Sequence, residues 1–411
     1  MMFKKLFCLV LALIFVSSIS VCVFSQEKEV ELVLWCGSWK EDFTIPVINE
    51  FEEKNPGIKV RVEYWPWDGM IDKFLIALKN DNGPDVINLA VDWTITFEAM
   101  GKLAPLDEFI AADKMDMSDF FEGALQTARY NGKTYALPYR SEAMGIFFNK
   151  KIFKEAGLNP DKAPETWPQL LEYAKATTKG DVFGWGLLGR DPENLFSQLI
   201  VMIWSNGGEI LNDDYTKCTL NEPAAVEAAQ FYVDLYRKYK VTPLSTMENN
   251  EEENVNLFTN EKVAMVMSGN YSIEKILKAN PNIQMGTAVP PKWKTIKLRL
   301  AGWNTAITNT CKNKEAAWKL IKFLSSTEIS PRYSHTFPGR KSAAKNEKYY
   351  KDPYQKAFLD LLNYSYPMPQ VPQMSQIKQI VYDQMQYALV GEKTGEQAMN
   401  DAVKEIDPLL K

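Results

Sequence analysis

Short apolar runs and amphipathic segments alternate along the chain beyond residue 30. Runs with a period of two predict strands, and apolar residues three or four positions apart predict helices. Strands are predicted at 31–35, 58–64 and 86–90, and helices at 45–51 and 71–78. Turn signals at Asn55-Pro56-Gly57 and Gly83-Pro84-Asp85 separate these elements. Because strands and helices alternate, we expect a parallel sheet covered by helices.

The same alternation continues through the rest of the chain. Helices are predicted at 150–156, 167–178, 192–205, 222–239, 255–260, 314–324 and 376–389, and strands at 182–189, 262–268, 285–289 and 298–307. Thr166 is expected to cap the helix that follows it, because its hydroxyl can accept a hydrogen bond from a free backbone N–H group. Residues 129–136 predict a hairpin with an Asn-Gly turn.

A polar stretch led by a proline runs directly into an apolar segment near the middle of the chain. The pattern predicts a turn at Pro138, followed by a buried strand at 145–148. A strand that crosses here between two lobes would place Tyr139, Arg140 and Glu142 at a hinge, facing the space between the lobes. The chain is expected to cross between the lobes near residues 140, 300 and 338.

The expected fold is therefore α/β, with two lobes joined by a hinge, and with a mostly parallel sheet flanked by helices in each lobe. The N-terminal lobe is predicted to comprise 26–140 plus 301–337, and the C-terminal lobe 141–300 plus 338–411. The chain of 411 residues is long enough for two cores.

Residues 1–25 have the pattern of a secretory signal peptide, with a basic start, an apolar run at 6–16 and a small-residue exit before Gln26. The apolar run is too short for an ordinary membrane span. Cys22 loosely resembles the anchored cysteine of a lipoprotein, but Val21 stands where a small residue is expected. We expect an exported protein in the periplasm or at the outer face of the cytoplasmic membrane, with a lipid anchor at Cys22 as the less favoured alternative.

Composition excludes several classes of function. Removal of Lys4 and Lys5 would lower the formal net charge from −5 to about −7, and no basic cluster remains for nucleic acid or an anionic membrane. The cysteines beyond Cys22 are Cys36, Cys218 and Cys311, which allow at most one disulfide. His335 is the single histidine, so His-based metal sites and Ser-His or Cys-His catalysis are excluded. No metal and no cofactor is expected.

Aromatic residues follow the predicted strands of the N-terminal part. Ligands of open α/β sheets gather beyond the carboxyl ends of the strands. The candidates at these positions are Trp39, Trp65, Trp67, Asp92 and Trp93. The chain contains 11 tryptophans, and several of them lie in predicted loops.

One motif resembles a known family. Gly145-Ile146-Phe147-Phe148-Asn149-Lys150 is similar to the signature of the carbohydrate class of extracellular solute-binding proteins, the binding components of ABC importers. Phe148 replaces the usual tyrosine, and Arg140 replaces a small residue. Landmarks that resemble maltodextrin-binding relatives, in the same order, are Gly83-Pro84-Asp85-Val86, Arg129-Tyr130-Asn131-Gly132-Lys133, Thr166-Trp167, Asn206-Gly207-Gly208, Gly269-Asn270-Tyr271 and Val371-Pro372-Gln373-Met374-Ser375.

The resemblance implies a two-lobed periplasmic-binding-protein fold that captures a sugar or oligosaccharide between its lobes, closes about a hinge and delivers the ligand to a membrane permease. It implies ligand contact for Trp39, Asp92, Trp93, Glu142 and Tyr271. Lys378 falls where maltodextrin binders have an aromatic plate, which disfavours a long linear glucan. Loop or hinge position alone adds Tyr139, Arg140, Trp204, Trp303, Asn304 and Arg340.

Structural roles compete with ligand binding at several of these positions. A loop tryptophan often only covers the core, as we expect for Trp167, Trp185, Trp293 and Trp318. Glu142 could pair with Arg140, Asp92 could cap the next helix, and Arg340 could bind backbone carbonyls. The acidic run 248–253 is expected to be a helix start rather than a calcium site, because it lacks the glycine turn of a calcium loop.

Enzymatic functions are not favoured. Gly184-Trp185-Gly186-Leu187-Leu188-Gly189 matches the dinucleotide fingerprint, but the residues before it are predicted to be helical and a tryptophan fills the turn. Asp92 and Glu142 could in principle be the two carboxylates of a glycoside hydrolase. A non-sugar solute is another alternative, because Tyr349-Tyr350 invites comparison with iron binders of related fold. The sequence therefore predicts a monomeric, non-enzymatic binding protein.

Overall fold

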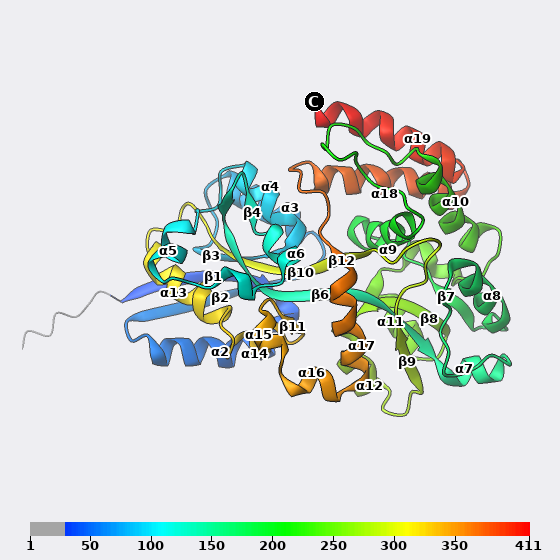
Figure 1. Ribbon diagram of the computed structural model, residues 1–411, viewed down its shortest axis with the longest axis horizontal. Coiled ribbons are helices and arrows are strands. Elements are labelled where there is room, and N and C mark those ends of the chain that lie inside the picture. The colour runs from blue at the N-terminus through cyan, green and yellow to red at the C-terminus, as the bar shows by residue number, and fades with distance from the viewer. Residues whose placement is uncertain (1–28) are drawn as a thin grey trace, which may run out of the picture.

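Two lobes lie side by side in the computed structural model, which describes residues 29–411 (Figure 1). The predicted signal peptide and Cys22 fall outside the described residues. The N-terminal lobe contains β1 (Val30–Gly37), β2 (Ile58–Trp65), β3 (Val86–Ala90), β4 (Arg129–Tyr130), β5 (Lys133–Thr134), α2 (Glu41–Lys54), α3 (Met70–Lys79), α4 (Thr94–Ala99), α5 (Asp107–Ala112), α6 (Glu122–Gln126), α13 (Lys314–Leu324) and α14 (Ser330–Ser334).

The C-terminal lobe is the more helical of the two. It contains β7 (Phe183–Gly186), β8 (Val263–Gly269), β9 (Met285–Ala288), α7 (Lys150–Glu155), α8 (Trp167–Thr177), α9 (Pro192–Ser205), α10 (Pro223–Arg237), α11 (Glu251–Thr259), α12 (Ser272–Ala279), α16 (Glu347–Lys351), α17 (Pro353–Leu361), α18 (Met374–Val390) and α19 (Gly395–Ile406). The elements at the junction are β6 (Ala136–Asn149), β10 (Leu298–Ile307), β11 (Phe337–Pro338), α15 (Lys341–Ala344) and β12 (Ser365–Tyr366).

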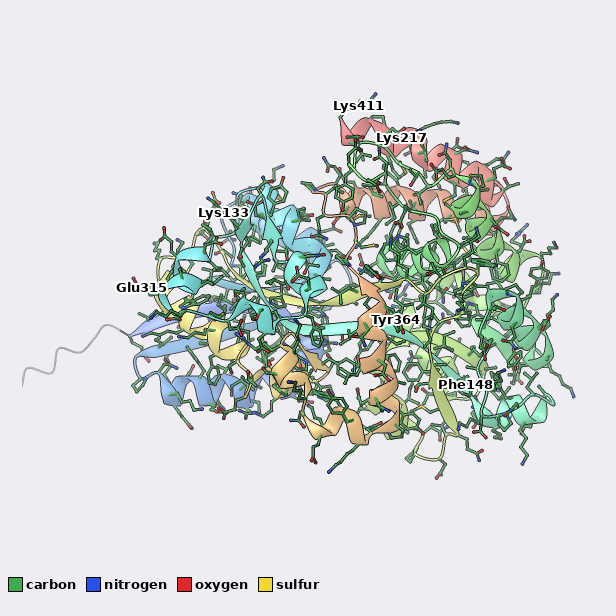
Figure 2. All side chains as sticks on the ribbon, in the orientation of Figure 1. Lys133, Phe148, Lys217, Glu315, Tyr364 and Lys411 are labelled. Atoms are coloured by element: carbon green, nitrogen blue, oxygen red, sulfur yellow. The ribbon has the colours of Figure 1, made fainter. Side chains whose placement is uncertain are left out.

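One mixed sheet runs through both lobes in the order β2-β1-β3-β10-β6-β8-β7. The pairs β1–β2 and β1–β3 are parallel, as is β7–β8, whereas β10 is antiparallel to β3 and β6, and β6 is antiparallel to β8. The α/β class predicted from the alternation is confirmed. Figure 2 labels Lys133, shortly before β6, on one lobe and Phe148, near the end of β6, on the other.

The expected turn at Pro138 is wrong, because β6 is one continuous strand of 14 residues that is buried along its whole length. It pairs with β10 over its first part and with β8 over its second part. Trp303 lies opposite Arg140 and Asn304 lies opposite Pro138, so Tyr139 is an extra residue in a bulge. A bulge is a place where a strand tolerates a proline, and pairing along both edges keeps the strand extended.

The local predictions for most helices are confirmed. The Thr166 hydroxyl accepts a hydrogen bond from the Gln169 N–H at 3.3 Å and caps α8. The acidic run leads into α11, whose N-terminus is closed by a reciprocal capping box between Asn250 and Glu253. Asn131 and Gly132 have positive φ angles in the β4–β5 hairpin, as the predicted turn requires.

Each lobe has its own hydrophobic core. One core draws on residues between 32 and 139 and between 303 and 333, and the other on residues between 143 and 298 and between 337 and 406. Cys36, Cys218 and Cys311 are buried and free. Two glycines of the dinucleotide-like motif serve close packing, since a Cβ on Gly184 or Gly189 would lie 2.2 Å from a backbone oxygen. The motif is therefore a packing feature of the core around β7.

We expect Gly302→Ala to lower the free energy of unfolding by about 3 kcal/mol or more. Gly302 has a φ of 144°, and a Cβ there would lie 2.3 Å from the Arg140 carbonyl oxygen of the paired crossing strand. Gly101→Ala is the matched control, because Gly101 has a φ of 67° and a Cβ there would meet no atom of a more distant described residue within 4 Å. The control should lose only about 1–2 kcal/mol. Equal losses in urea unfolding would contradict the close approach of β6 and β10.

Candidate functional site

Four tryptophans gather at the carboxyl edge of the N-terminal sheet. Trp39 follows β1, Trp67 follows β2, Trp93 follows β3, and Trp303 lies in β10. The rings of Trp67 and Trp93 are stacked with centroids 5.5 Å apart, and Trp39 lies 5.2 Å from Trp303. Trp39 is 37% exposed, whereas Trp93 and Trp303 are buried. We call this group, Trp39, Trp67, Trp93 and Trp303, the tryptophan wall. Its exposed member, Trp39, offers an apolar ring of the kind that stacks on flat apolar ligand surfaces, and the other three rings pack around it and on one another.

The strand-end rule also selected Trp65, a partly buried residue that packs against the N-terminal core. Its ring packs on Trp35 at 4.8 Å and on Phe74 at 6.0 Å, within the N-terminal core. Phe74 in turn contacts Trp93 edge-on at 6.4 Å. Trp65 therefore supports the wall from behind, and direct ligand contact by Trp65 remains a prediction.

The wall touches the C-terminal lobe. The Trp67 indole N–H donates a hydrogen bond to Asp191 Oδ2 at 3.2 Å. Asp191 is the N-cap of α9, and its other carboxylate oxygen accepts from the backbone N–H groups of Glu193 and Asn194 at 2.8 and 3.1 Å. Burial raises the pKa of the Asp191 carboxyl. The start of α9 thus faces the tryptophan wall across the junction of the lobes.

Four charged side chains lie beside this contact. We call Asp92, Glu193, Arg299 and Lys378 the charge quartet. Lys378 Nζ donates to Asp92 Oδ2 at 2.8 Å and to both Glu193 carboxylate oxygens at 2.9 Å. The Arg299 guanidinium pairs with Asp92 and Glu193 and donates to the hydroxyl of Ser197. Burial would raise the pKa of the Asp92 carboxyl, but the Arg299 and Lys378 cations outweigh it and hold that pKa at about 2.

A second polar group lies on the crossing strand. Arg140 and Glu142 are two residues apart on β6 and so point to the same side. Arg140 Nε donates to Glu142 Oε1 at 2.6 Å, and the guanidinium carbon lies 5.6 Å from the centre of the Tyr271 ring. The Tyr271 hydroxyl donates to Glu251 Oε1 at 2.5 Å, and burial raises the pKa of the Glu251 carboxyl. Glu142 therefore pairs with Arg140, which is the structural role considered for it from the sequence. A ligand role for Arg140, Glu142 and Tyr271 stays a prediction.

Four predicted residues lie outside these groups. Tyr139 packs against Tyr333 at 4.8 Å in the N-terminal core, and Trp204 is buried at the end of α9 in the C-terminal core. Asn304 donates to the hydroxyls of Thr94 and Thr127 at 2.9 and 3.1 Å. Arg340 donates to the Ser325 carbonyl at 2.7 Å, and this is the contact with a backbone carbonyl that the sequence analysis considered for it. Their contact with ligand stays a prediction.

Sequence reasoning missed Lys40, Glu193, Glu251 and Arg299. Lys40 directly follows Trp39, so the strand-end rule could have selected it. It is 1% exposed, and its Nζ has no hydrogen-bond partner among the described residues. The ammonium lies 3.3 Å from the centre of the Tyr333 ring and 4.1 Å from that of Tyr139. Burial lowers the pKa of Lys40 well below its usual value.

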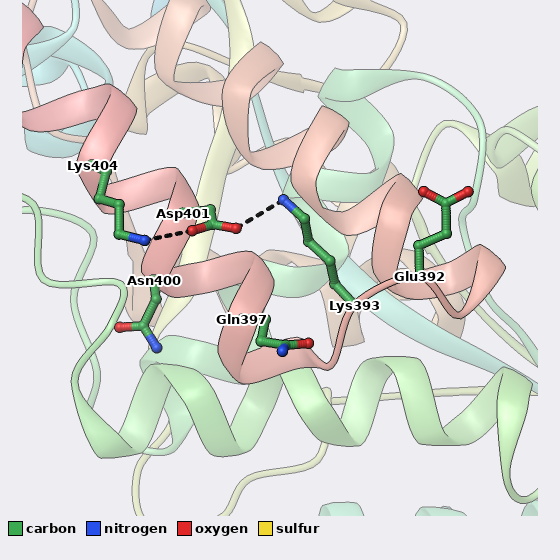
Figure 3. A pocket seen from close by; sticks show the side chains of 6 residues that line it. All are labelled: Glu392, Lys393, Gln397, Asn400, Asp401 and Lys404. Atoms are coloured by element: carbon green, nitrogen blue, oxygen red, sulfur yellow. Dashed lines mark hydrogen bonds and ion pairs between the residues drawn. The ribbon is translucent and has the colours of Figure 1, made fainter.

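Two polar hollows lie away from the tryptophan wall. One is lined by Glu392, Lys393, Gln397, Asn400, Asp401 and Lys404 on the surface of the C-terminal lobe (Figure 3). The other is lined by Asp113, Met115, Lys322, Ser326, Thr327 and Arg340 on the N-terminal lobe. Neither contains the aromatic surface of the wall. Among residues 29–411, no group of three or more His, Cys, Asp or Glu side chains is placed to hold a metal ion.

Two α/β lobes, crossing strands between them, and an aromatic wall of one lobe in contact with polar groups of the other define a binding protein of the hinge-closing class. Comparisons with known proteins identify the family. The model for the bacterial extracellular solute-binding protein family matches residues 37–330. A putative binding protein of Brucella abortus (strain 2308) is 30% identical over 374 residues, which cover 88% of each chain. The chain belongs to the bacterial extracellular solute-binding protein family.

Other relatives and solved structures also match nearly the whole length of this chain. The galactooligosaccharide-binding protein of Bacillus subtilis (strain 168) is 26% identical, covering 92% of this chain and 89% of its own. An ABC transporter solute-binding protein of Thermotoga lettingae, solved with α-D-tagatose, has a TM-score of 0.87 and 29% identity over 93% of this chain and 100% of that one. Maltose-bound MalE3 of T. maritima has a TM-score of 0.84 and 25% identity over 92% of this chain and 100% of that one.

Family membership indicates a location outside the cytoplasm. In the part of the chain from residue 29 onward, no helix combines the length and the apolar character needed to cross a bilayer.

We expect Lys40→Met to raise the free energy of unfolding by about 1–3 kcal/mol at pH 7, because it removes a buried amine without a hydrogen-bond partner among the described residues. The pKa of Lys40 is lowered on folding, so the unfolded chain binds its proton more tightly. The advantage of the variant should therefore be largest at low pH and should shrink as the pH rises towards 10.5.

Lys54→Met is the control for this series, since the Lys54 side chain is 51% exposed. It should change stability by less than about 0.5 kcal/mol at every pH. Thermal unfolding between pH 6 and pH 10 measures both variants. A Lys40→Met protein that is less stable than the wild type throughout would contradict the placement of this amine.

Proposed function

We propose that this protein captures a sugar or oligosaccharide between its lobes and delivers it to the membrane permease of an ABC importer. The observation that carries the proposal is the tryptophan wall, whose faces match the apolar C–H faces of a sugar ring. The guanidinium of Arg140 and the carboxylate of Glu142, on the strand paired with Trp303, supply partners for hydroxyl groups. A relative named for galactooligosaccharide and two similar structures solved with tagatose and with maltose support the same class of ligand.

Binding and closure are coupled in this proposal. The sugar first stacks on the exposed Trp39 at the edge of the wall, and groups of the C-terminal lobe then complete its contacts. A ligand shifts the balance between open and closed forms only by its preference for the closed form. Contacts that both lobes make with the sugar therefore add to the preference for the form that is closed about the crossing strands β6, β10 and β11.

We also propose the cellular setting. The protein acts as a monomer after removal of residues 1–25, in the periplasm or at the outer face of the cytoplasmic membrane, and it does not bind nucleic acid. Its lobes comprise 26–140 plus 301–337 and 141–300 plus 338–411. A lipid anchor at Cys22 and a non-sugar solute remain the alternatives.

The two carboxylates considered for hydrolysis, Asp92 and Glu142, fit that reaction poorly. Glycoside hydrolysis needs one carboxyl group that holds a proton near neutral pH. Asp92 is clasped by Arg299 and Lys378, which hold its pKa at about 2, and the carboxylate of Glu142 accepts from Arg140. The proposed protein releases its ligand unaltered.

We expect Trp39→Ala to weaken binding of the recognised sugar by about 10-fold or more, because an aromatic contact contributes up to about 1.5 kcal/mol beyond buried area. A thermal-shift screen of mono- and oligosaccharides would first select the sugar, and isothermal titration would then give the affinities. Trp39 is partly exposed, so its removal should leave the fold intact.

Trp293→Ala is the matched control for this titration. Trp293 is a partly buried tryptophan that packs on Trp167 and Phe231 of the C-terminal lobe, at 5.8 and 5.2 Å. It should bind the sugar as the wild type does. Equal affinity of the Trp39→Ala variant and the wild type would remove the wall from the binding site, and a wild type that binds no sugar of the screen would contradict the proposed ligand class.

A further inference from the structure

The charge quartet joins the two lobes. Asp92 lies beside Trp93, which is part of the N-terminal core. Glu193 is in the first turn of α9, and Lys378 is on α18 beside Ile377, both within the C-terminal lobe. Arg299 lies at the start of β10 and is fastened to α9 through Ser197 and Glu193. Three members are thus held together on the C-terminal side, and Asp92 is the single member from the other lobe.

The charges of the quartet balance only when Asp92 is present. Arg299 and Lys378 carry two positive charges and Glu193 carries one negative charge, so the C-terminal members alone have a net charge of +1. Asp92 brings the quartet to neutrality. The side chains of Asp92 and Lys378 are only 1% and 3% exposed. A buried cation that loses its counter-charge is strongly destabilising, because it has given up its hydration.

The Asp92 carboxylate contacts its partners in the way that a small carboxylate ion from solution would. Its Oδ2 accepts from Arg299 Nη2 and from Lys378 Nζ, while Glu193 satisfies the remaining side of Lys378. Two cations converge on one oxygen, and the Ser197 hydroxyl lies next to the same guanidinium. The C-terminal lobe therefore presents two cations for a carboxylate, Arg299 and Lys378, and Ser197 holds the guanidinium in place.

Other contacts between the lobes are weaker. The Trp67–Asp191 hydrogen bond has a neutral donor. The Thr96 hydroxyl reaches the Pro372 carbonyl at 3.3 Å. His335 pairs with Glu274 at 2.8 Å, but the two side chains are 31% and 68% exposed, and exposed pairs contribute little. Among these contacts between the lobes, only the quartet joins oppositely charged side chains that are buried, as Asp92 and Lys378 are.

We propose that Arg299 and Lys378 form a carboxylate-binding site on the C-terminal lobe, and that Asp92 of the N-terminal lobe docks in this site and holds the lobes together in the absence of sugar. When the lobes separate, the site exposes its uncompensated cation to water, where it can bind a small carboxylate. When the lobes close, Asp92 replaces that ion. Docking of Asp92 does not depend on which ligand the protein binds, so the docking and the proposed ligand class can each be wrong independently of the other.

Small-angle X-ray scattering of the sugar-free protein tests the docking. The wild type should give the radius of gyration of the closed form, and Asp92→Asn and Lys378→Met should each give a larger one. Removing one partner of a buried ion pair should shift the open–closed equilibrium by about 100-fold or more. Circular dichroism checks that the variants are folded, and the use of two variants covers the case in which one of them is not.

Asp401→Asn is the matched control. Asp401 is also an aspartate between two lysines, Lys393 and Lys404, each at 2.8 Å, but all three belong to the same lobe (Figure 3). This variant should keep the wild-type radius. A wild-type radius in both Asp92→Asn and Lys378→Met, or an Asp401→Asn protein that opens equally, would overturn the proposal.

Chemical rescue tests the carboxylate site itself. Asp92→Ala leaves space and an unbalanced cation, so formate should raise its melting temperature and restore a smaller radius, whereas equal ionic strength supplied as chloride should have a smaller effect. The wild type, with the site already filled, should respond equally to the two salts. A formate-specific increase of the same size in the wild type, or none in Asp92→Ala, would show that the residues do not form a carboxylate site.

Discussion

The pairing of β6 with β10 is the constraint on which the rest of the molecule depends. Both strands pass from one lobe into the other, and β6 is buried along its whole length, so neither lobe can complete its sheet alone. The same pairing sets Trp303 opposite Arg140, which brings the end of the tryptophan wall next to the polar group on β6. Relative movement of the lobes must therefore occur about a pair of strands that also carry site residues.

Aromatic and ionic groups have different roles at the junction. The tryptophan wall presents ring faces that can hold a ligand without a fixed pattern of hydrogen bonds. The charge quartet beside it is neutral, three of its members are buried, and each member pairs with another member. Such a network gives little net stability compared with apolar packing, but it penalises every arrangement in which the charges separate. We therefore assign ligand capture to the tryptophan wall, and the balance between open and closed forms to the neighbouring charge quartet.

Hydrophobic periodicity predicted most elements because each strand and helix buries one face or both locally. The strand-end rule brought Trp39, Trp67 and Trp93 together correctly, since parallel strands end at one edge of a sheet. Pro138 misled the local prediction, because pairing along both edges of β6 is not visible in a window of residues. The quartet was out of reach for the same reason: Asp92 and Lys378 are 286 positions apart, and nothing in a single sequence links them.

Sugar binding against the tryptophan wall, between closed lobes, is the core of the proposed function. A crystal structure grown with the sugar that gives the largest thermal shift would show the ligand in place. We expect one intact sugar whose apolar face lies about 4 Å from the rings of Trp39 and Trp303, with groups of both lobes on its hydroxyls. A sugar bound elsewhere on the surface, or one found cleaved in the site, would contradict this function.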